Sequence, residues 1–249
     1  MIELYHAWDS FCSFKVRLCL EEKGLIWTGH VLDLMKFENL RPDYLKVNPA
    51  GLVPALVDGG TVITESSIIN EYLDDAYPQV RLRPKDAKAT VRMRHWVRHE
   101  EDELFIAVRP ASLNLMMKQV LGRYSEAELD ALLRHHPRQD RVAFLKKTFH
   151  EPYDPDAVAK SRRRLATALK RMNATLTDAP WLAGEDYSLA DIAAAPVVDR
   201  IEYLGMADLW HDLPGVKGWV ARLQARPAYA RALPLDERRL PAPQVAAAR

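Results

Sequence analysis

The hydrophobic pattern of this chain changes near Tyr77-Pro78, and that change limits the possible fold more than any other feature. Before this point, strand-like and helical runs alternate in the order β-α-β and then β-β-α. After it, the strong signals have the helical period of about 3.6 residues. We therefore expect an α/β domain over residues 1–80 with helices on both faces of a sheet, an all-helical domain over residues 81–240, and a flexible Ala- and Pro-rich tail over residues 241–249.

The expected elements are delimited by turn and cap residues. Strand-like runs cover residues 2–5, 28–32, 54–57 and 61–63. Asp58-Gly59-Gly60 predicts a hairpin turn between the last two runs, and Gly24 ends the first helix. Helical runs cover residues 14–23 and 66–77 in the first domain, and in the second domain 86–118, 125 onward, 154–176, 192–198, 214–225 and 227–233.

Two short stretches in the first domain predict a binding site. Asn48–Leu56 places a proline at the entry of a strand, and Thr64–Ser67 places a Glu-Ser pair at the start of a helix. The backbone at a strand entry can pair with an extended peptide, and the N–H groups at a helix start can bind a carboxylate. Together they favour a small anionic peptide as the ligand, of which glutathione is the abundant cellular example.

The charge balance and the cysteines limit the partners and the compartment. The chain has 35 Lys and Arg residues and 34 Asp and Glu residues, so its charge is nearly balanced. No global attraction to nucleic acid or to a membrane surface is therefore expected. Cys12 and Cys19 lie seven apart in one helical run, about 10 Å along the axis, which is too far for a disulfide. No apolar run has the roughly 18 residues of a membrane span, and no signal peptide is evident. We expect a cytoplasmic protein.

Four features together resemble the cytosolic glutathione transferases along nearly the whole chain: Ser10–Arg17, Asn48-Pro49 through Val53-Pro54, Glu65-Ser66, and the Ser188-x-x-Asp191 cap. The resemblance implies a thioredoxin-like first domain with a cis proline after Val53, followed by an all-α helical bundle. It implies a transferase of the EC 2.5.1.18 type that uses glutathione as cosubstrate and a small hydrophobic electrophile as second substrate. It also implies a homodimer, with no metal, nucleic acid or membrane partner.

Within that family the chain is similar to the serine-using classes. Tyr5 lies in the first strand, about where the tyrosine-using classes have theirs, but the frame from Ser10 to Val16-Arg17 matches the serine types. The long region 119–160 resembles the bacterial β-aryl-etherase type. Ether cleavage, dehalogenation and thiol–disulfide reduction through Cys12 therefore stand beside general conjugation as alternatives, and a non-enzymatic glutathione-binding module is the least favoured.

Catalysis by this family needs the glutathione thiol as thiolate, and the free thiol has a pKa of about 8.5. A hydroxyl that donates to the sulfur at a helix N-terminus favours the anion. We expect Ser10 to supply it, although Ser10 can also be only a helix cap. Ser13 and Cys12 are the alternative sulfur contacts, and Cys12 can instead be a packed small apolar residue.

The resemblance assigns glutathione binding to a set of residues around the two stretches: Lys36, Asn39, Leu52, Val53, Pro54, Glu65 and Ser66. Val53 presents its N–H and C=O to the cysteinyl backbone. Glu65 takes the γ-glutamyl ammonium, while the hydroxyl and N–H of Ser66 take the adjacent carboxylate. Asn39, or else Lys36, contacts the glycyl carboxylate, and either can instead be a solvated loop residue.

The second substrate is expected between the domains, against the first half of the long helical run. The candidates are mostly apolar: Trp8, Phe11, Met35, Arg109, Leu113, Met116 and Met117. Methionine-rich walls adapt to varied apolar ligands. Arg109 can bind an anionic substrate group or pair with a carboxylate. His95 and His99 have a spacing that zinc can use, and His135-His136 is a second pair, but neither has an evident third ligand, so no metal is expected.

Overall fold

The computed structural model describes residues 1–134, 136–234 and 239–240, so the expected tail and His135 lie outside the described residues. The N-terminal part contains a four-stranded mixed sheet in the order β2-β1-β3-β4. Its strands are β1 (Ile2–His6), β2 (Trp27–Val31), β3 (Ala55–Asp58) and β4 (Thr61–Thr64). β1 runs parallel to β2 and antiparallel to β3. This confirms the succession of strands and helices expected from the pattern and the thioredoxin-like fold implied by the resemblance.

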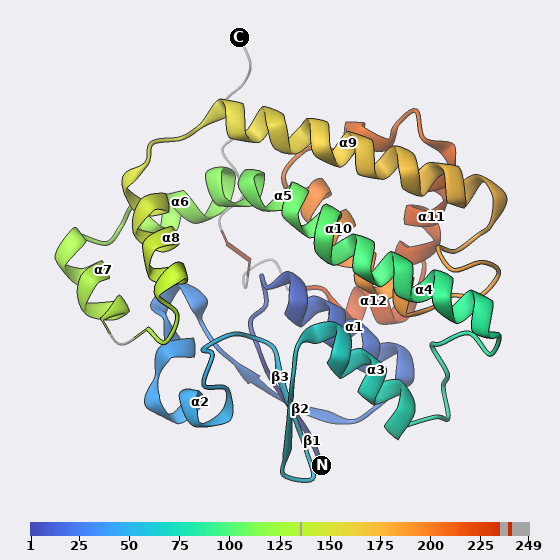
Figure 1. Cartoon of the computed structure of the whole chain (residues 1–249), viewed down its shortest axis with the longest axis horizontal. Coiled ribbons are helices and arrows are strands. Elements are labelled where there is room, and N and C mark those ends of the chain that lie inside the picture. Colours follow the sequence, from blue (N-terminus) through green and yellow to red (C-terminus); the bar gives the residue numbers. More distant parts are fainter. Residues whose placement is uncertain (135, 235–238, 241–249) are drawn as a thin grey trace.

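Three helices cover the two faces of this sheet (Figure 1). They are α1 (Phe11–Lys23), α2 (Pro42–Val47) and α3 (Ser66–Ala76). Leu4 is fully buried on the side of α1 and α3. Side chains alternate along a strand, so Tyr5 points to the opposite face, where its ring lies 5.7 Å from that of Tyr44 in α2. α1 begins at Phe11, three residues earlier than expected, because Ser10 caps it.

The expected long helix of the second part is one nearly continuous stretch of helical backbone. It comprises α4 (Ala87–His99), α5 (Phe105–Ser112) and α6 (Lys118–Leu121). π-helical turns over Glu100–Leu104 and Leu113–Met117 join these segments. Such turns occur frequently at functional sites. The first one contacts the sheet-bearing part, because Glu100 pairs with Lys15 of α1 and Glu101 accepts a hydrogen bond from Ser67 of α3.

The remaining helices complete the bundle. They are α7 (Glu126–Leu133), α8 (Gln139–His150), α9 (Pro155–Asp178), α10 (Leu189–Tyr203), α11 (Pro214–Gln224) and α12 (Pro227–Ala232). α10 is almost wholly buried at the centre. The carboxylate of Asp191 accepts hydrogen bonds from Ser188 N (3.0 Å), Leu182 N (3.0 Å) and Trp219 Nε1 (2.9 Å). This expected cap therefore ties three segments of the bundle together.

α7 and α8 form a separate lobe over the side of the molecule that carries α2 (Figure 1). A small apolar cluster joins this lobe to the loop after β2, and its buried members are Phe37, Leu121, Leu129, Leu133 and Leu145. The Tyr124 hydroxyl donates to the Met35 carbonyl at 2.7 Å. α8 was not expected from the sequence, and it brings a new wall over the sheet-bearing part.

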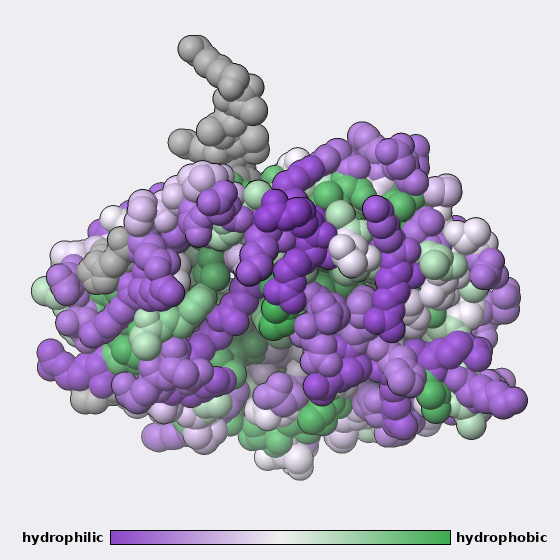
Figure 2. All heavy atoms as spheres, turned by 45° about the horizontal axis from the view of Figure 1, so that its top comes forward, coloured by the Kyte–Doolittle hydropathy of each residue, from purple (hydrophilic) through white to green (hydrophobic). Residues whose placement is uncertain are grey.

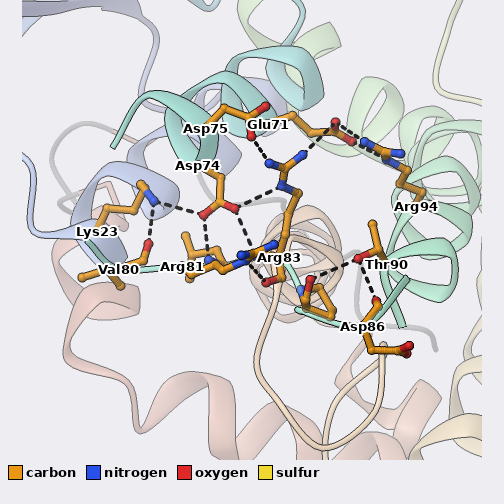
Figure 3. A network of polar contacts seen from close by, with 12 residues as sticks. Lys23, Glu71, Asp74, Asp75, Val80, Arg81, Arg83, Asp86, Thr90 and Arg94 are labelled. Carbon is orange, nitrogen blue, oxygen red and sulfur yellow. Dashed lines mark hydrogen bonds and ion pairs between the residues drawn. The ribbon is translucent and has the colours of Figure 1, made fainter. Parts of the chain in front are cut away.

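The connection between the two parts is fixed by a buried polar network around Asp74 at the end of α3 (Figure 3). Its carboxylate accepts hydrogen bonds from Lys23 Nζ at 3.1 Å, Leu82 N at 2.7 Å, and both the backbone N and the Nε of Arg83 at 3.2 Å. Lys23 also donates to the Val80 carbonyl at 2.6 Å. The linker that follows α3 is thus held against α1.

The surface seen from the α9 side is mainly hydrophilic, and apolar residues show there in smaller patches (Figure 2). The main apolar core runs from the sheet through α1 and α3 into the bundle without interruption. Among the described residues, no helix is long and apolar enough to cross a membrane.

A cavity between the sheet and the helical bundle

A cavity of about 390 Å³ opens between the two parts of the chain. The sheet-bearing part lines it with the turn over residues 9–12, the loop after β2, residues 48–54 and the start of α3. The helical part lines it with α5, the π-helical turn after it, α8 and Arg200 of α10. Both predicted stretches therefore meet at one cavity, and the helical part supplies the opposite wall.

Ser10 lies at the N-terminus of α1 and lines this cavity. Its Oγ accepts the backbone N–H of Ser13 at 3.2 Å, which is a helix-capping bond. A capping hydroxyl uses only a lone pair toward the helix, so the hydroxyl proton of Ser10 remains available for a ligand. Ser13 is fully buried, its Oγ accepts the N–H of Ala7 at 3.3 Å, and it is not part of the lining.

Cys12 lines the cavity two residues after Ser10. Burial raises the pKa of its thiol, and this effect outweighs the opposing influence of the Lys15 ammonium and of the Ser66 hydroxyl. Lys15 itself forms a buried ion pair with Glu100. The Cys12 side chain is therefore a protonated thiol at neutral pH, whereas a reactive cysteine requires the thiolate.

The loop before β3 is shaped by side chains that hold its backbone. Asn48 Oδ1 accepts the N–H of Ala50 at 3.0 Å, and Asn48 Nδ2 donates to the Leu52 carbonyl at 2.7 Å. Asn39 Nδ2 donates to the Gly51 carbonyl at 2.7 Å. The Val53–Pro54 peptide is cis. Within the described part of the chain, the N–H and C=O of Val53 pair with no protein group, so both are available at the cavity.

Glu65 and Ser66 lie where β4 gives way to α3. Glu65 has φ 66° and ψ 110°, a backbone conformation that costs a side-chain-bearing residue about 1–3 kcal/mol. Ser66 is the first residue of α3, is buried, and lines the cavity with Glu65. Strain of this kind is found at ligand sites, where the surrounding structure holds it. The pair thus presents a carboxylate, a hydroxyl and helix N–H groups at one edge of the cavity.

Most of the other predicted residues also line the cavity: Asn39, Leu52, Pro54, Phe11, Met35, Arg109, Leu113 and Met117. Besides Ser13, three predicted residues lie outside this lining. Lys36 is exposed and pairs with Asp33 at 3.1 Å. Trp8 lies under the Arg17 guanidinium, 4.6 Å from its ring centroid. Met116 is fully buried in the core. Tyr5, the alternative to Ser10, is also outside the lining and stacks on His30.

Sequence reasoning missed several residues of the lining. Arg200 donates to the Asp9 carbonyl at 2.7 Å and lies over the Phe11 ring at 5.0 Å, so it braces the turn before α1. The only sign of this role in the sequence was that Arg200 is a charged residue in an apolar helix. His136, Arg141 and Phe144 lie on or beside α8. Because α8 is polar, its sequence did not indicate which of its faces lines a cavity.

Models of the glutathione S-transferase family match two parts of the chain. The N-terminal domain model matches residues 9–76, and the C-terminal domain model matches residues 115–227. Together these matches span well over half of the 249 residues. They include the capped turn, the Val53–Pro54 loop and the Glu65-Ser66 pair.

Individual relatives agree with these matches. Protein LigF from Sphingobium sp. strain SYK-6 is 27% identical over 91% of each chain. The crystal structure of β-etherase LigF from that strain has a TM-score of 0.85 over 93% of this chain and 98% of that one. Tetrachloro-p-hydroquinone reductive dehalogenase from Sphingobium chlorophenolicum is 28% identical over 94% of this chain and 96% of that one. A zeta-class transferase from Euphorbia esula is 45% identical over 34% of this chain and 38% of its own.

Proposed function

Because the chain belongs to the glutathione S-transferase family, we propose that it is an enzyme that activates the glutathione thiol to attack a small electrophile with an apolar body. One observation supports this proposal above the others. A single cavity joins the capped Ser10 turn and the unpaired backbone of Val53 to an apolar wall from the helical part. That arrangement provides a place for a peptide thiol and a place for a second substrate.

In this proposal Ser10 donates its hydroxyl proton to the glutathione sulfur. The same side chain caps α1, so the N-terminus of that helix also faces the sulfur and favours negative charge there. Cys12, whose thiol pKa is raised by burial, is a second donor to the sulfur in this reaction. Ser13 supports the turn from below.

Glutathione itself is held by the sheet-bearing part. Val53 supplies a backbone N–H and C=O for the cysteinyl residue, as an added strand would. Glu65 binds the γ-glutamyl ammonium, and Ser66 binds the neighbouring carboxylate with its hydroxyl and its N–H. Asn39 and Leu52 face the glycyl end. The bound thiolate attacks carbon, the S–C bond forms, and the leaving group departs with the electron pair.

Ether cleavage or dehalogenation is the finer form of this proposal. A β-etherase and a reductive dehalogenase are both similar to this chain over more than 90% of its length. α8 adds a wall to the cavity, and the aromatic residues Phe105 and Phe144 suit an aromatic ligand.

Thiol–disulfide chemistry through Cys12 is a second candidate, because the thiol lines the cavity beside Ser66. In that reaction the Cys12 thiolate attacks the glutathione sulfur of a disulfide between glutathione and the substrate, which forms a Cys12–glutathione disulfide and releases the substrate as a thiol. A second glutathione then attacks that disulfide, which frees Cys12 and leaves glutathione disulfide. The raised pKa of the thiol makes this the slower route at neutral pH. Replacing Cys12 with Ser separates the two, because conjugation should continue while reduction stops.

The test of the proposed function combines binding and turnover. Glutathione is titrated calorimetrically into the wild type, Ser66→Ala and Asp75→Ala, the last being an exposed control on α3 that does not line the cavity. Turnover is then measured on a chloronitrobenzene, a β-aryl ether and a mixed disulfide. We expect micromolar to millimolar binding that weakens about tenfold in Ser66→Ala alone. Absence of glutathione binding by the wild type would refute the proposal.

A further inference from the structure

Two arginines face the cavity from the helical part. Arg109 lies on α5 and Arg141 on α8, both line the cavity, and both are partly buried. Among the described residues neither forms an ion pair. The Arg109 guanidinium lies 4.5 Å from the ring centroid of Phe144, which is a cation–π contact. Burial lowers the pKa of the Arg141 guanidinium, and the nearby positive charge of Arg109 lowers it further.

Other arginines around the cavity do have acidic partners. Arg138 pairs with Asp140 at 2.6 Å, Arg239 with Asp199 at 2.7 Å, and Arg200 approaches Asp9 at 4.0 Å. Burying a charge without a partner is unfavourable, and placing two like charges together adds to that cost. The fold keeps Arg109 and Arg141 unpaired in the same cavity, so their counterion is expected to come from a ligand.

His136 adds a third polar group beside this pair. It is buried, lines the cavity, and its Nδ1 accepts the backbone N–H of Arg138 at 2.9 Å. An Nδ1 that accepts a hydrogen bond leaves the proton of the neutral ring on Nε2. Burial, together with Arg141 and Arg138, lowers the pKa of His136, so the ring is neutral at physiological pH. Two guanidinium groups and one neutral N–H donor suit an anion.

The surroundings of the arginines indicate which molecule carries that anion. Leu113 and Met117 line the cavity on the helical stretch that continues from Arg109, and Phe144 stacks on the Arg109 guanidinium. The groups proposed to hold glutathione all lie on the sheet-bearing part. The cationic groups and the apolar side chains of the helical wall therefore occur together, on the part of the chain that does not carry the proposed glutathione groups.

We propose that Arg109 and Arg141 bind a carboxylate on the second substrate, so that the electrophile is an aromatic or similarly apolar body with an acidic group at one end. This inference rests on the proposed function, since it names the class of electrophile that the same cavity takes. Each arginine can donate two parallel hydrogen bonds to a carboxylate. The carboxylate is bound there while the apolar body extends along Leu113 and Met117 toward the Ser10 turn.

The test uses two matched electrophiles, a chloronitrobenzoate and its methyl ester. The full-length wild type is compared with Arg109→Met and Arg141→Met, which keep an apolar stem, and with Arg134→Gln, an exposed arginine at the end of α7 that does not line the cavity. We expect the wild type to prefer the acid in kcat/KM by about tenfold or more. Each Met variant should lose that preference through a higher KM for the acid, while turnover of the ester, the KM for glutathione and the Tm stay as in the wild type. Arg134→Gln should behave as the wild type.

Several outcomes would overturn the inference. One is an equal kcat/KM of the wild type for the ester and the acid. Another is an equal loss of kcat/KM for both substrates in the two Met variants. A third is weaker glutathione binding in the Met variants, which would show that the arginines serve glutathione instead.

If neither electrophile reacts, calorimetry with nitrobenzoate and methyl nitrobenzoate tests the same site without turnover. Acid binding that depends on both arginines supports the site, and equal binding of acid and ester contradicts it. Failure of the proposed function is distinct, because it shows as a wild type that does not bind glutathione.

Discussion

The side chains at the cavity show how one residue serves both folding and chemistry. Ser10 caps α1 with a lone pair and keeps its proton for a ligand, and Asn48 gives both ends of its amide to the loop before Val53. Sequence patterns could predict these residues because a cap and an Asn-Pro turn have local signatures. They could not predict Arg141 or His136, whose meaning depends on a helix that packs from elsewhere in the chain.

Cys12 gives a prediction at this scale. Alkylation requires the thiolate, and burial raises the pKa of this thiol, so little of the anion is present at neutral pH. We expect iodoacetamide to modify Cys12 more slowly than free cysteine at pH 7.5, with a rate that rises as the pH is increased above 9. Mass spectrometry of the modified peptide measures the rate, and Cys12→Ser shows the contribution of the buried Cys19. Rapid modification of Cys12 at neutral pH would contradict the raised pKa.

At the scale of elements, the strands and the long helices could be predicted from the sequence, but α8 in the long region 119–160 could not. The hairpin at residues 55–64 and the helices beginning near residues 66, 155, 189 and 214 have clear turn or cap residues. α8 has no side-chain cap at its N-terminus, and its residues Val142, Phe144 and Leu145 pack with the small cluster around Phe37. Such a helix depends on tertiary contacts, which a sequence pattern does not contain.

The network around Asp74 makes a stability prediction for the junction of α3 with the linker. Asp74→Ala leaves the buried Lys23 ammonium without its carboxylate and the Leu82 N–H without an acceptor. Breaking a buried pair from one side costs about 3–5 kcal/mol. Urea denaturation should show that loss in the free energy of unfolding. The exposed neighbour Asp75, which also pairs with Arg83, is the control, and Asp75→Ala should cost less than about 1 kcal/mol. Similar losses in both variants would show that the buried network contributes little.

For the whole molecule, the two parts share one core, and residues 239–240 contact the turn before α1 and α10. Leu240 N donates to the Asp9 carboxylate beside the Ser10 turn, and Arg239 pairs with Asp199 of α10. The two-part architecture could be predicted because the hydrophobic period changes once, near Tyr77-Pro78. The lining of the cavity could not be predicted, because its walls come from separate stretches of the chain, residues 9–66 on one side and residues 105–145 and 200 on the other.

The proposed homodimer is tested at this scale. Ile68 of α3 and Val91 of α4 are 59% and 54% exposed, and the Glu71–Arg94 pair joins their two helices. We expect sedimentation equilibrium at micromolar concentration to give twice the 28.4 kDa mass of the chain. A Val91→Glu variant should shift the mass toward the monomer, because it places a charge on an apolar surface. Ile26→Glu, at a site that is 95% exposed elsewhere, should leave the mass unchanged. A wild-type mass of one chain would contradict the dimer.

The most direct test of the account is the thiol pKa of bound glutathione in wild type and Ser10→Ala. Thiolate absorbance is followed against pH, with Cys12→Ser as the matched comparison at the same turn. We predict that the wild type holds this pKa well below the free value of about 8.5, and that Ser10→Ala raises it by about one unit or more. Cys12→Ser should change it little. An unchanged pKa in Ser10→Ala, with glutathione still bound, would contradict the assignment of Ser10 as the group that activates the sulfur.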